Sequence, residues 1–495
     1  MQFKSDLYKR PLLHKRVDAK TIVRVNKDPN AFQGHKIVKV ADLEFPYILN
    51  SKEPVIFDFG DHYTGYLNME FDNCKETPHI ADSPTNIVFE FSEMPIEIDE
   101  RPIDNPQCLS VSWMQDDYKT MAILPYKGSL DRRVSFRYLK IKRVDPVRFP
   151  VQINALYVDA VSAVDLDSVP SLNSDDELLN KIDRICLKTL KECEQDVFED
   201  GPKRDRRLWI GDLRLQALLD YKTFKNIDLV KRCICLFADH LQTDGKVAPC
   251  VFPDSPPYVD NWYFMDYSLC FVSCLYDFMK NIGDREFAQQ FYDIAAFQVK
   301  FANEHFNRKT KTLETPVFID HTNFDKSIAL LCYFAYTLNH MVELSKLLNK
   351  EYKSYEKILS EVKEAILSYY CEKEGFFVTS KGEISWHSQI WAVLAGVLSK
   401  EESDKLLRRT AKEDPELRFS SPFIHHYYIE ALYSCGMDKE ALEHIKLYWG
   451  AMLKAGFDCC PECLMLNNEY WTGYGHPSLN SACHAWSCTA SYWLR

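Results

Sequence analysis

The chain has 495 residues, of which 46% are hydrophobic and 27% are charged, and its formal net charge is -12. This length is enough for two or three domains with sizeable cores. The sequence has no basic block, which argues against nucleic acid as a partner because phosphate binding requires clustered Lys and Arg. No stretch reaches the roughly 18 apolar residues that a membrane span requires, so no association with a membrane is expected.

The N-terminus and the cysteines predict a cytoplasmic protein. The opening residues, MQFKSDLYKRPLLHKR, contain no apolar core and therefore do not have the pattern of a signal peptide. The seventeen cysteines are an odd number in a large chain. Without a secretion signal they are expected to be reduced thiols, packed mostly as small hydrophobic residues.

Residues 1–165 are predicted to form a β domain. Alternating or short apolar runs predict strands at Lys36–Val40, Pro54–Phe59, Tyr66–Phe71, Asn86–Phe91, Val134–Val144 and Ile153–Ala160. Turn residues separate them, among them Gly60-Asp61 and Asp82-Ser83-Pro84. Several short strands with polar loops are typical of a β-sandwich. Such a domain either binds carbohydrate or covers one end of the next domain, and we favour the second role.

Residues 166–495 are predicted to be helical. A polar linker at Val164–Asn173 precedes a change to the helical period. Twelve helices are expected to begin near residues 174, 212, 226, 263, 285, 324, 350, 385, 401, 422, 438 and 480. The third shows the pattern well, because Ile227, Val230, Ile234, Phe237 and Leu241 share one face.

The stretch from Asp200 to Asp212, D-G-P-K-R-D-R-R-L-W-I-G-D, concentrates charge beside a large aromatic residue. Gly201 and Pro202 break the chain, and a helical apolar pattern follows, so we expect a polar loop that opens a helix with Asp212 near its N-cap. A salt-bridged helix start would explain the stretch. A site that holds a polyhydroxylated ligand would explain it as well, because Asp and Arg bind hydroxyls and Trp packs on the apolar face of a sugar ring.

This stretch resembles the signature of the inverting α-L-rhamnosidases, glycoside hydrolase family 78, which runs roughly D-C-P-x-R-E-R-x-G-W-x-G-D. The matching residues are Asp200, Pro202, Arg204, Trp209, Gly211 and Asp212. The resemblance implies that the predicted helices form six hairpins closed into an (α/α)6 barrel behind the β-sandwich. It also implies that Asp200, Arg204, Trp209 and Asp212 bind the sugar.

The resemblance places Asp205 where the family has a Glu that acts as the general acid. The cations Arg204, Arg206 and Arg207 would lower the pKa of this carboxyl, whereas a general acid requires a raised pKa. Burial, or a second carboxylate such as Asp200, must therefore outweigh them.

The general base is expected near the C-terminus, in AGFDCCPECLMLNNEYWTGYGHPSLNSACHAWSCTASYWL. By resemblance Glu462 is the base, with Glu469 as the second choice, and His484 contacts the sugar. Trp471 is a candidate stacking platform, and the resemblance further suggests Trp262 and Asp266 as sugar-contacting residues. The pairs Trp386-His387 and His425-His426 are better explained as barrel packing.

The sequence therefore predicts an inverting glycoside hydrolase that removes a terminal α-L-rhamnose-like sugar from oligosaccharides or small glycosides. For inversion, Asp205 and Glu462 should be roughly 6.5–9.5 Å apart. We predict no cofactor and no metal, although the cysteines around Glu462 leave a zinc–cysteine glycosidase open. The sequence is also compatible with a different sugar specificity, with an inactive carbohydrate-binding pseudoenzyme and with a homodimer.

Overall fold

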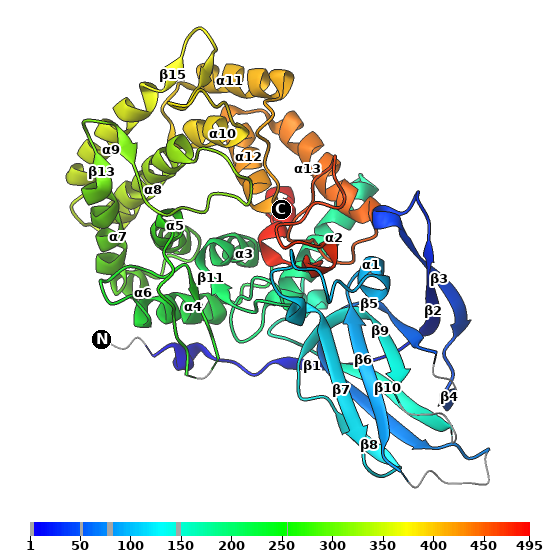
Figure 1. Ribbon diagram of the computed structural model, residues 1–495. Coiled ribbons are helices and arrows are strands. Elements are labelled where there is room, and N and C mark those ends of the chain that lie inside the picture. The colour runs from blue at the N-terminus through cyan, green and yellow to red at the C-terminus, as the bar shows by residue number, and fades with distance from the viewer. Residues whose placement is uncertain (1–3, 50–52, 77–82, 145–149, 255) are drawn as a thin grey trace.

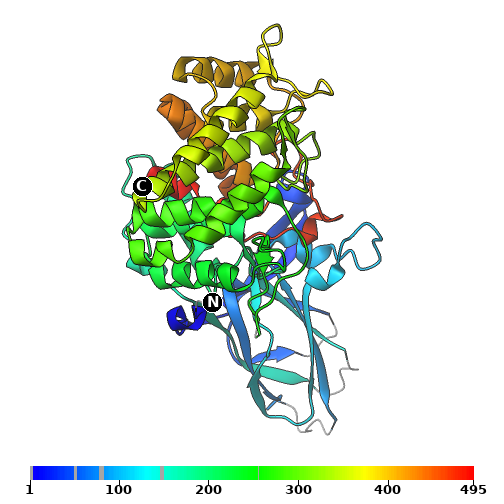
Figure 2. The ribbon, with the colours of Figure 1, turned by 90° about the vertical axis from the view of Figure 1, so that its left-hand side faces the viewer.

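The computed structural model in Figure 1 describes residues 4–49, 53–76, 83–144, 150–254 and 256–495. The turn predicted at Asp82-Ser83-Pro84 begins at Asp82, which lies outside the described residues. A β-rich part and a ring of helices lie against one another, with both the N-terminal and the C-terminal ends of the chain at the helical part (Figures 1 and 2). Each part has its own large apolar core.

The described strands of the β-rich part form one hydrogen-bonded system of ten strands. The strands are β1 (Leu13–Asp18), β2 (Thr21–Lys27), β3 (His35–Asp42), β4 (Tyr47–Leu49), β5 (Val55–Asn73), β6 (Thr85–Ser92), β7 (Gln115–Met121), β8 (Tyr126–Ser129), β9 (Val134–Arg143) and β10 (Val151–Ser162). The long strand β5 connects different strands along its length. Its first half pairs with β2 and β9, and its second half pairs with β8 and β10.

The turn predicted at Gly60-Asp61 is wrong, because β5 passes through it. The pairing register with β9 shifts between Asp58 and Tyr63, and Gly60 has a φ of 81°. This is a bulge that bends the strand without ending it, since the neighbouring strands pair on both sides of it. Two predicted strands are thereby one.

The helical part contains eleven helices of ten residues or more among its described residues. They are α2 (Glu177–Cys193), α3 (Ile210–Lys222), α4 (Ile227–Asp239), α5 (Met265–Asn281), α7 (Tyr292–His305), α8 (Ser327–Leu347), α9 (Lys353–Leu367), α10 (Trp386–Ala395), α11 (Lys400–Glu413), α12 (Pro422–Cys435) and α13 (Asp438–Lys454). The short helices are α1 (Pro95–Asp99), α6 (Arg285–Gln289) and α14 (Ala490–Leu494).

Alternate helices form the inner layer of the ring. Helices α3, α5, α8, α10 and α12 pack on one another in this order, and the turn Ala485–Ser487 with α14 joins α12 back to α3 and α2. The inner helices are buried nearly all round, whereas outer helices such as α9 and α11 bury one face only. The predicted β-sandwich followed by an (α/α)6 barrel is therefore confirmed.

The helix predicted near residue 480 is wrong. The chain there forms short turns, Pro477–Leu479 and Ala485–Ser487, before α14. The backbone N–H groups of His484 and Ala485 donate to the carbonyls of Cys460 (2.9 Å) and Asp200 (2.8 Å). These bonds to distant loops replace the helical hydrogen bonds and hold the C-terminal segment against the stretch after α2.

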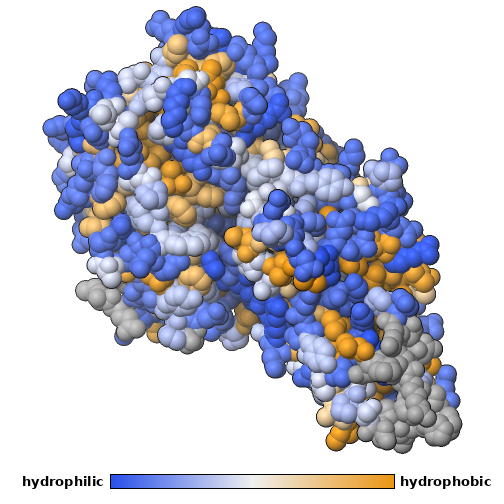
Figure 3. Space-filling model, in the orientation of Figure 1, coloured by the Kyte–Doolittle hydropathy of each residue, from blue (hydrophilic) through white to orange (hydrophobic). Residues whose placement is uncertain are grey.

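No helix among the described residues is long and apolar enough to cross a membrane. In the view of Figure 3 most of the surface is hydrophilic, and apolar residues are gathered in separate patches on the helical and the β-rich parts.

Candidate active site

A cavity of about 280 Å³ lies where the loops of the helical ring meet the β-rich part. Its wall comes from five stretches: the segment before α3, the start of α5, the segment before α8, the C-terminal segment and the β6–β7 connection. The lining residues are Leu109, Trp113, Asp200, Arg204, Asp205, Arg207, Trp209, Asp212, Trp262, Phe264, Tyr267, Phe318, His321, Glu462, Tyr474, His484 and Trp486.

The loop before α3 folds back on itself and carries Arg204 and Asp205 at its turn. The Asp200 N–H donates to the Arg207 carbonyl (3.1 Å), and the Asp200 carboxylate accepts the Arg207 N–H (3.0 Å). A Cβ on Gly201 would lie 3.0 Å from both the Cys483 carbonyl and the Ser481 hydroxyl oxygen. Glycine here lets the loop pack closely on the C-terminal segment.

Arg204 and Glu462 form a buried ion pair at one wall of the cavity. The Glu462 carboxylate accepts hydrogen bonds from the Arg204 guanidinium and the Tyr474 hydroxyl. The guanidinium lies 3.9 Å from the centre of the Tyr474 ring and 5.0 Å from that of Trp113. Burial raises the pKa of Glu462, but Arg204, His321 and His484 together hold it well below its usual range. Glu462 is therefore ionised.

The surroundings of Asp205 shift its pKa in the opposite direction. Burial, followed by the charge of Asp200, raises the pKa of the Asp205 carboxyl above its usual range. Arg204 and Arg207 act in the other direction but do not outweigh these two effects; the Arg207 guanidinium is 4.0 Å from the carboxylate. The condition stated from the sequence, that burial or Asp200 must overcome the neighbouring arginines, is met.

His484 lies between two further carboxyls at the floor of the cavity. Its Nε2 is 3.6 Å from Asp200 Oδ2, and its Nδ1 is 3.6 Å from Asp212 Oδ1. Although burial lowers it, the pKa of His484 is raised by Asp200, Glu462 and Asp212. Burial raises the pKa of Asp212 well above its usual range, despite the proximity of His484.

Several polar atoms at this floor have no hydrogen-bond partner among the described residues. They are Arg204 Nε, Asp212 Oδ1, His321 Nε2 and His484 Nδ1, all buried. Buried polar groups in native proteins are nearly always paired. Asp212 Oδ1 and His484 Nδ1 face each other at 3.6 Å, and His321 Nε2 is 3.7 Å from Glu462 Oε1, so these polar atoms are available to hydrogen-bonding groups that enter the cavity.

The comparisons with known proteins agree with this geometry. Residues 19–160 match the model of the glycosyl hydrolase family 78 alpha-rhamnosidase N-terminal domain. Residues 167–495, which are more than half of the chain, match the bacterial alpha-L-rhamnosidase six-hairpin glycosidase domain. The chain belongs to glycosyl hydrolase family 78. A comparison with curated proteins finds no match.

Solved structures of this family have the same fold. A rhamnosidase from Klebsiella oxytoca with rhamnose bound is 34% identical, with a TM-score of 0.95 over 99% of this chain and 97% of that chain. A family 78 rhamnosidase of Bacillus sp. GL1 is 18% identical, with a TM-score of 0.76 over 94% of this chain and 50% of that one. The Streptomyces avermitilis alpha-L-rhamnosidase complexed with L-rhamnose is 14% identical, with a TM-score of 0.70 over 98% and 44%.

Most of the site residues predicted for this family 78 chain line the one cavity. They are Asp200, Arg204, Asp205, Trp209, Asp212, Trp262, Glu462 and His484. Asp212 lies near the N-cap of α3 as expected, because the N-cap is Trp209 and Asp212 is in the first turn.

Three candidates are absent from the wall of this cavity. The Asp266 carboxylate accepts the backbone N–H groups of Phe318 (3.1 Å) and Ile319 (2.7 Å), so it supports the loop before α8 from behind. Trp471 lines a separate, smaller hollow, and its ring centre is 6.4 Å from that of His321. Glu469 is exposed and borders the same smaller hollow.

The sequence analysis missed Leu109, Trp113, His321, Tyr474 and Trp486. Tyr474 and Trp486 lie inside the C-terminal stretch already singled out, where aromatic content was a usable signal. Leu109 and Trp113 come from the β-rich part, on the connection between β6 and β7, and the Leu109 N–H donates to the Tyr474 carbonyl (3.1 Å). The β-rich part therefore contributes residues to the cavity and does more than cover the barrel.

Proposed function

We propose that this protein hydrolyses terminal α-L-rhamnosidic bonds with inversion of the anomeric centre. The observation that carries the proposal is that one cavity holds a carboxyl with a raised pKa, Asp205, and a carboxylate with a lowered pKa, Glu462. Environments that separate two carboxyl pKa values in this way assign the acid and the base.

In the proposed reaction Asp205 donates its proton to the glycosidic oxygen as the bond from that oxygen to the anomeric carbon breaks. A water molecule attacks the same carbon from the opposite face, and Glu462 accepts the proton that this water loses. The expected separation of the two carboxyls, roughly 6.5–9.5 Å, leaves room for the water. Arg204 keeps Glu462 ionised, and Tyr474 fixes the direction of its carboxylate.

The sugar would be held by the unpaired polar atoms at the floor of the cavity, with Asp200 beside them. Trp209 and the half-exposed Trp262 would pack against its ring face. The choice of rhamnose is supported by the Klebsiella oxytoca relative, which is described with rhamnose bound.

A second hollow, of about 600 Å³, adjoins the cavity and would receive the leaving group. The two share Trp113, Arg204, Asp205 and Arg207. Its wall is lined largely by side chains of both charges, so a hydroxyl-rich leaving group such as a second sugar suits it better than a flat apolar aglycone. A disaccharide should therefore have a lower KM than a simple alkyl rhamnoside.

Hydrolysis of a panel of chromogenic glycosides tests the proposal, with wild type run beside Asp205→Asn and Glu462→Gln. Turnover of the α-L-rhamnoside is expected in wild type, and proton NMR of the first product should show the β anomer. Turnover should be lost in Glu462→Gln, whereas Asp205→Asn should retain part of it because a chromogenic leaving group needs little protonation. Turnover that survives Glu462→Gln unchanged would refute the site assignment. Binding without turnover in wild type would favour the inactive carbohydrate-binding pseudoenzyme. Turnover of another glycoside in the panel would change the proposed sugar specificity.

A zinc–cysteine mechanism has a specific candidate group, because ligand atoms of His321, Glu462 and Cys463 lie within 4.8 Å of one another. Glu462, however, is directly paired with the Arg204 guanidinium, whose charge opposes a cation at that position. We therefore favour the carboxylate pair. Turnover should therefore be retained in Cys463→Ser, which removes the cysteine of this candidate group.

Further features of the protein remain proposals. We propose residues 1–165 and 166–495 as the two domains. None of the seventeen cysteines forms a disulfide, which supports a reducing, cytoplasmic location and a role in intracellular carbohydrate metabolism. Cell fractionation tests this location. The homodimer remains a prediction, which light scattering of the purified protein can test.

A further inference from the structure

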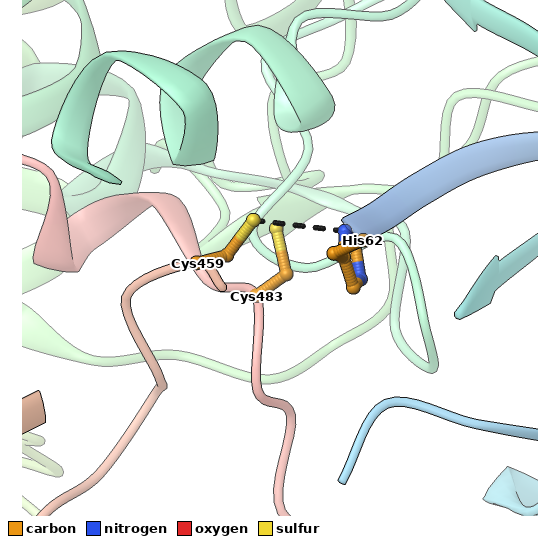
Figure 4. A group of neighbouring side chains, drawn as sticks. All are labelled: His62, Cys459 and Cys483. Carbon is orange, nitrogen blue, oxygen red and sulfur yellow. Dashed lines mark hydrogen bonds between the residues drawn. The ribbon is translucent and has the colours of Figure 1, made fainter. Parts of the chain in front are cut away.

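Beneath the floor of the cavity lies a buried cluster of thiols and one imidazole that the proposed hydrolysis does not use. His62 is on β5, Cys459 follows α13, and Cys483 is in the C-terminal segment (Figure 4). One potential ligand atom from each lies within 4.8 Å of the other two. Cys193, at the end of α2, adds a fourth ligand atom, since its sulfur is 4.0 Å from that of Cys483.

The spacing of these atoms is close to that around a tetrahedral zinc ion. With Zn–S bonds of about 2.3 Å and Zn–N bonds of about 2.0 Å, tetrahedral angles place two sulfurs about 3.8 Å apart and a sulfur and a nitrogen about 3.5 Å apart. The Cys193 and Cys483 sulfurs are 4.0 Å apart, and Cys459 Sγ is 3.6 Å from His62 Nδ1. His62, Cys459 and Cys483 already have ligand atoms within 4.8 Å of one another, whereas Cys193 is close to Cys483 alone and its side chain must turn toward the other two to reach the same ion.

The imidazole is oriented as a metal ligand requires. His62 Nε2 is 3.0 Å from a Glu93 carboxylate oxygen and 2.9 Å from the Ser135 hydroxyl, both buried. A carboxylate on one ring nitrogen fixes the proton there and leaves the other nitrogen, here Nδ1, free to bind a metal. That nitrogen is the one that faces the Cys459 sulfur (Figure 4).

Zinc with three thiolates and a neutral imidazole carries one net negative charge. Lys191 interacts electrostatically with Cys459 and Cys483, and Lys188 interacts with Cys459. Lys191 is also paired with the buried Glu192 (3.0 Å). All four ligand residues are almost completely buried, as is usual for a structural zinc site without an open coordination position.

We propose that His62, Cys193, Cys459 and Cys483 bind one structural Zn²⁺ ion. Binding would release the three thiol protons to solvent. Cys483 directly precedes His484, Cys459 precedes Glu462 by three residues, and the Cys193 sulfur lies 3.8 Å from the Asp200 carbonyl oxygen. The ion would thus tie β5 to the three segments that carry the floor of the cavity.

This proposal departs from the absence of metal expected from the sequence. The ligands come from four segments separated by more than a hundred residues, apart from the neighbouring pair Cys459 and Cys483. The sequence shows Cys459, Cys460 and Cys463 together around Glu462, but Cys460 and Cys463 lie outside this cluster. The metal site stands independently of the proposed hydrolysis.

Metal analysis of the full-length protein, produced in medium containing zinc and passed through gel filtration, tests the site. One zinc ion per chain is expected in wild type. The double variant Cys459→Ser, Cys483→Ser should lose it. The matched control Cys332→Ser, which removes an equally buried thiol on α8, should retain it.

A second measurement covers the case in which the double variant fails to fold. Wild type stripped by a chelator should regain its melting temperature on addition of Zn²⁺. With Co²⁺ it should show a thiolate-to-metal charge-transfer band, weaker in Cys193→Ser. A zinc-free wild type that does not respond to either ion, or a Cys193–Cys483 disulfide found by mass spectrometry, would overturn the proposal. Loss of rhamnoside hydrolysis in Asp205→Asn alone would leave it unaffected.

Discussion

Replacing Asp205 with Asn removes the transferable proton while the size of the side chain is almost unchanged. General acid catalysis contributes about 10²- to 10⁴-fold, or about 3–5 kcal/mol of transition-state stabilisation. We expect kcat/KM for an alkyl rhamnoside to fall by that factor. A 4-nitrophenyl rhamnoside, whose leaving group needs little protonation, should lose far less.

Stability should not fall with activity in this variant. Because burial and Asp200 raise the pKa of Asp205 in the folded protein, its favourable contribution is complete only below the unfolded pKa. That contribution is lost as the pH rises through the folded pKa. Near neutral pH the Asn variant should therefore melt at the same temperature as wild type or slightly higher.

The assay is steady-state kinetics with both substrates across pH, together with thermal melts. In wild type the basic limb of kcat/KM should report Asp205 and the acidic limb Glu462, whose pKa is lowered. The basic limb should disappear in Asp205→Asn. Asp42→Asn, which changes an exposed acid at the end of β3 outside both hollows, is the control. Equal losses on both leaving groups, or an unchanged basic limb, would refute the assignment.

Three further perturbations test other parts of the site. Glu462→Gln should abolish turnover of both rhamnosides. It should also lower the free energy of unfolding by about 3–5 kcal/mol, because it leaves the Arg204 charge buried without its partner. A denaturant melt that matches that of wild type would contradict this. Trp113→Ala should raise KM about 10-fold with a smaller change in kcat. It removes a wall residue whose packing and cation–π contact contribute about 1–2 kcal/mol. An unchanged KM would show that Trp113 does not touch the substrate. Asp266→Ala should lower stability by about 2–5 kcal/mol, because it leaves the N–H groups of Phe318 and Ile319 unpaired. Its loss in kcat/KM should be much smaller than that of Asp205→Asn. Unchanged stability with a large loss in kcat/KM would mark Asp266 as a substrate contact.

The sequence alone determined the order of the two parts and predicted the stretches that line the cavity. Hydrophobic periodicity is a local property, so it located five of the ten strands of the β-rich part and eleven of the twelve predicted helices, and it missed β1, β2, β4, β7 and β8. The resemblance named eight residues that the fold brings to one cavity: seven lie in Asp200–Asp212 and the C-terminal segment, and the eighth is Trp262. It also named Asp266, because similarity in sequence does not show whether a side chain faces the cavity or supports it from behind.

Only the tertiary structure decided the electrostatic states and the residues contributed from distant segments. Burial and Asp200 raise the pKa of Asp205, although the nearby Arg204 and Arg207 lower it. The sequence shows the arginines beside Asp205 but not how deeply its carboxyl is buried. Trp113 and His62 reach the barrel through the placement of the β-rich part. Burial and long-range proximity arise when the whole chain packs, and a local pattern of residues does not contain them.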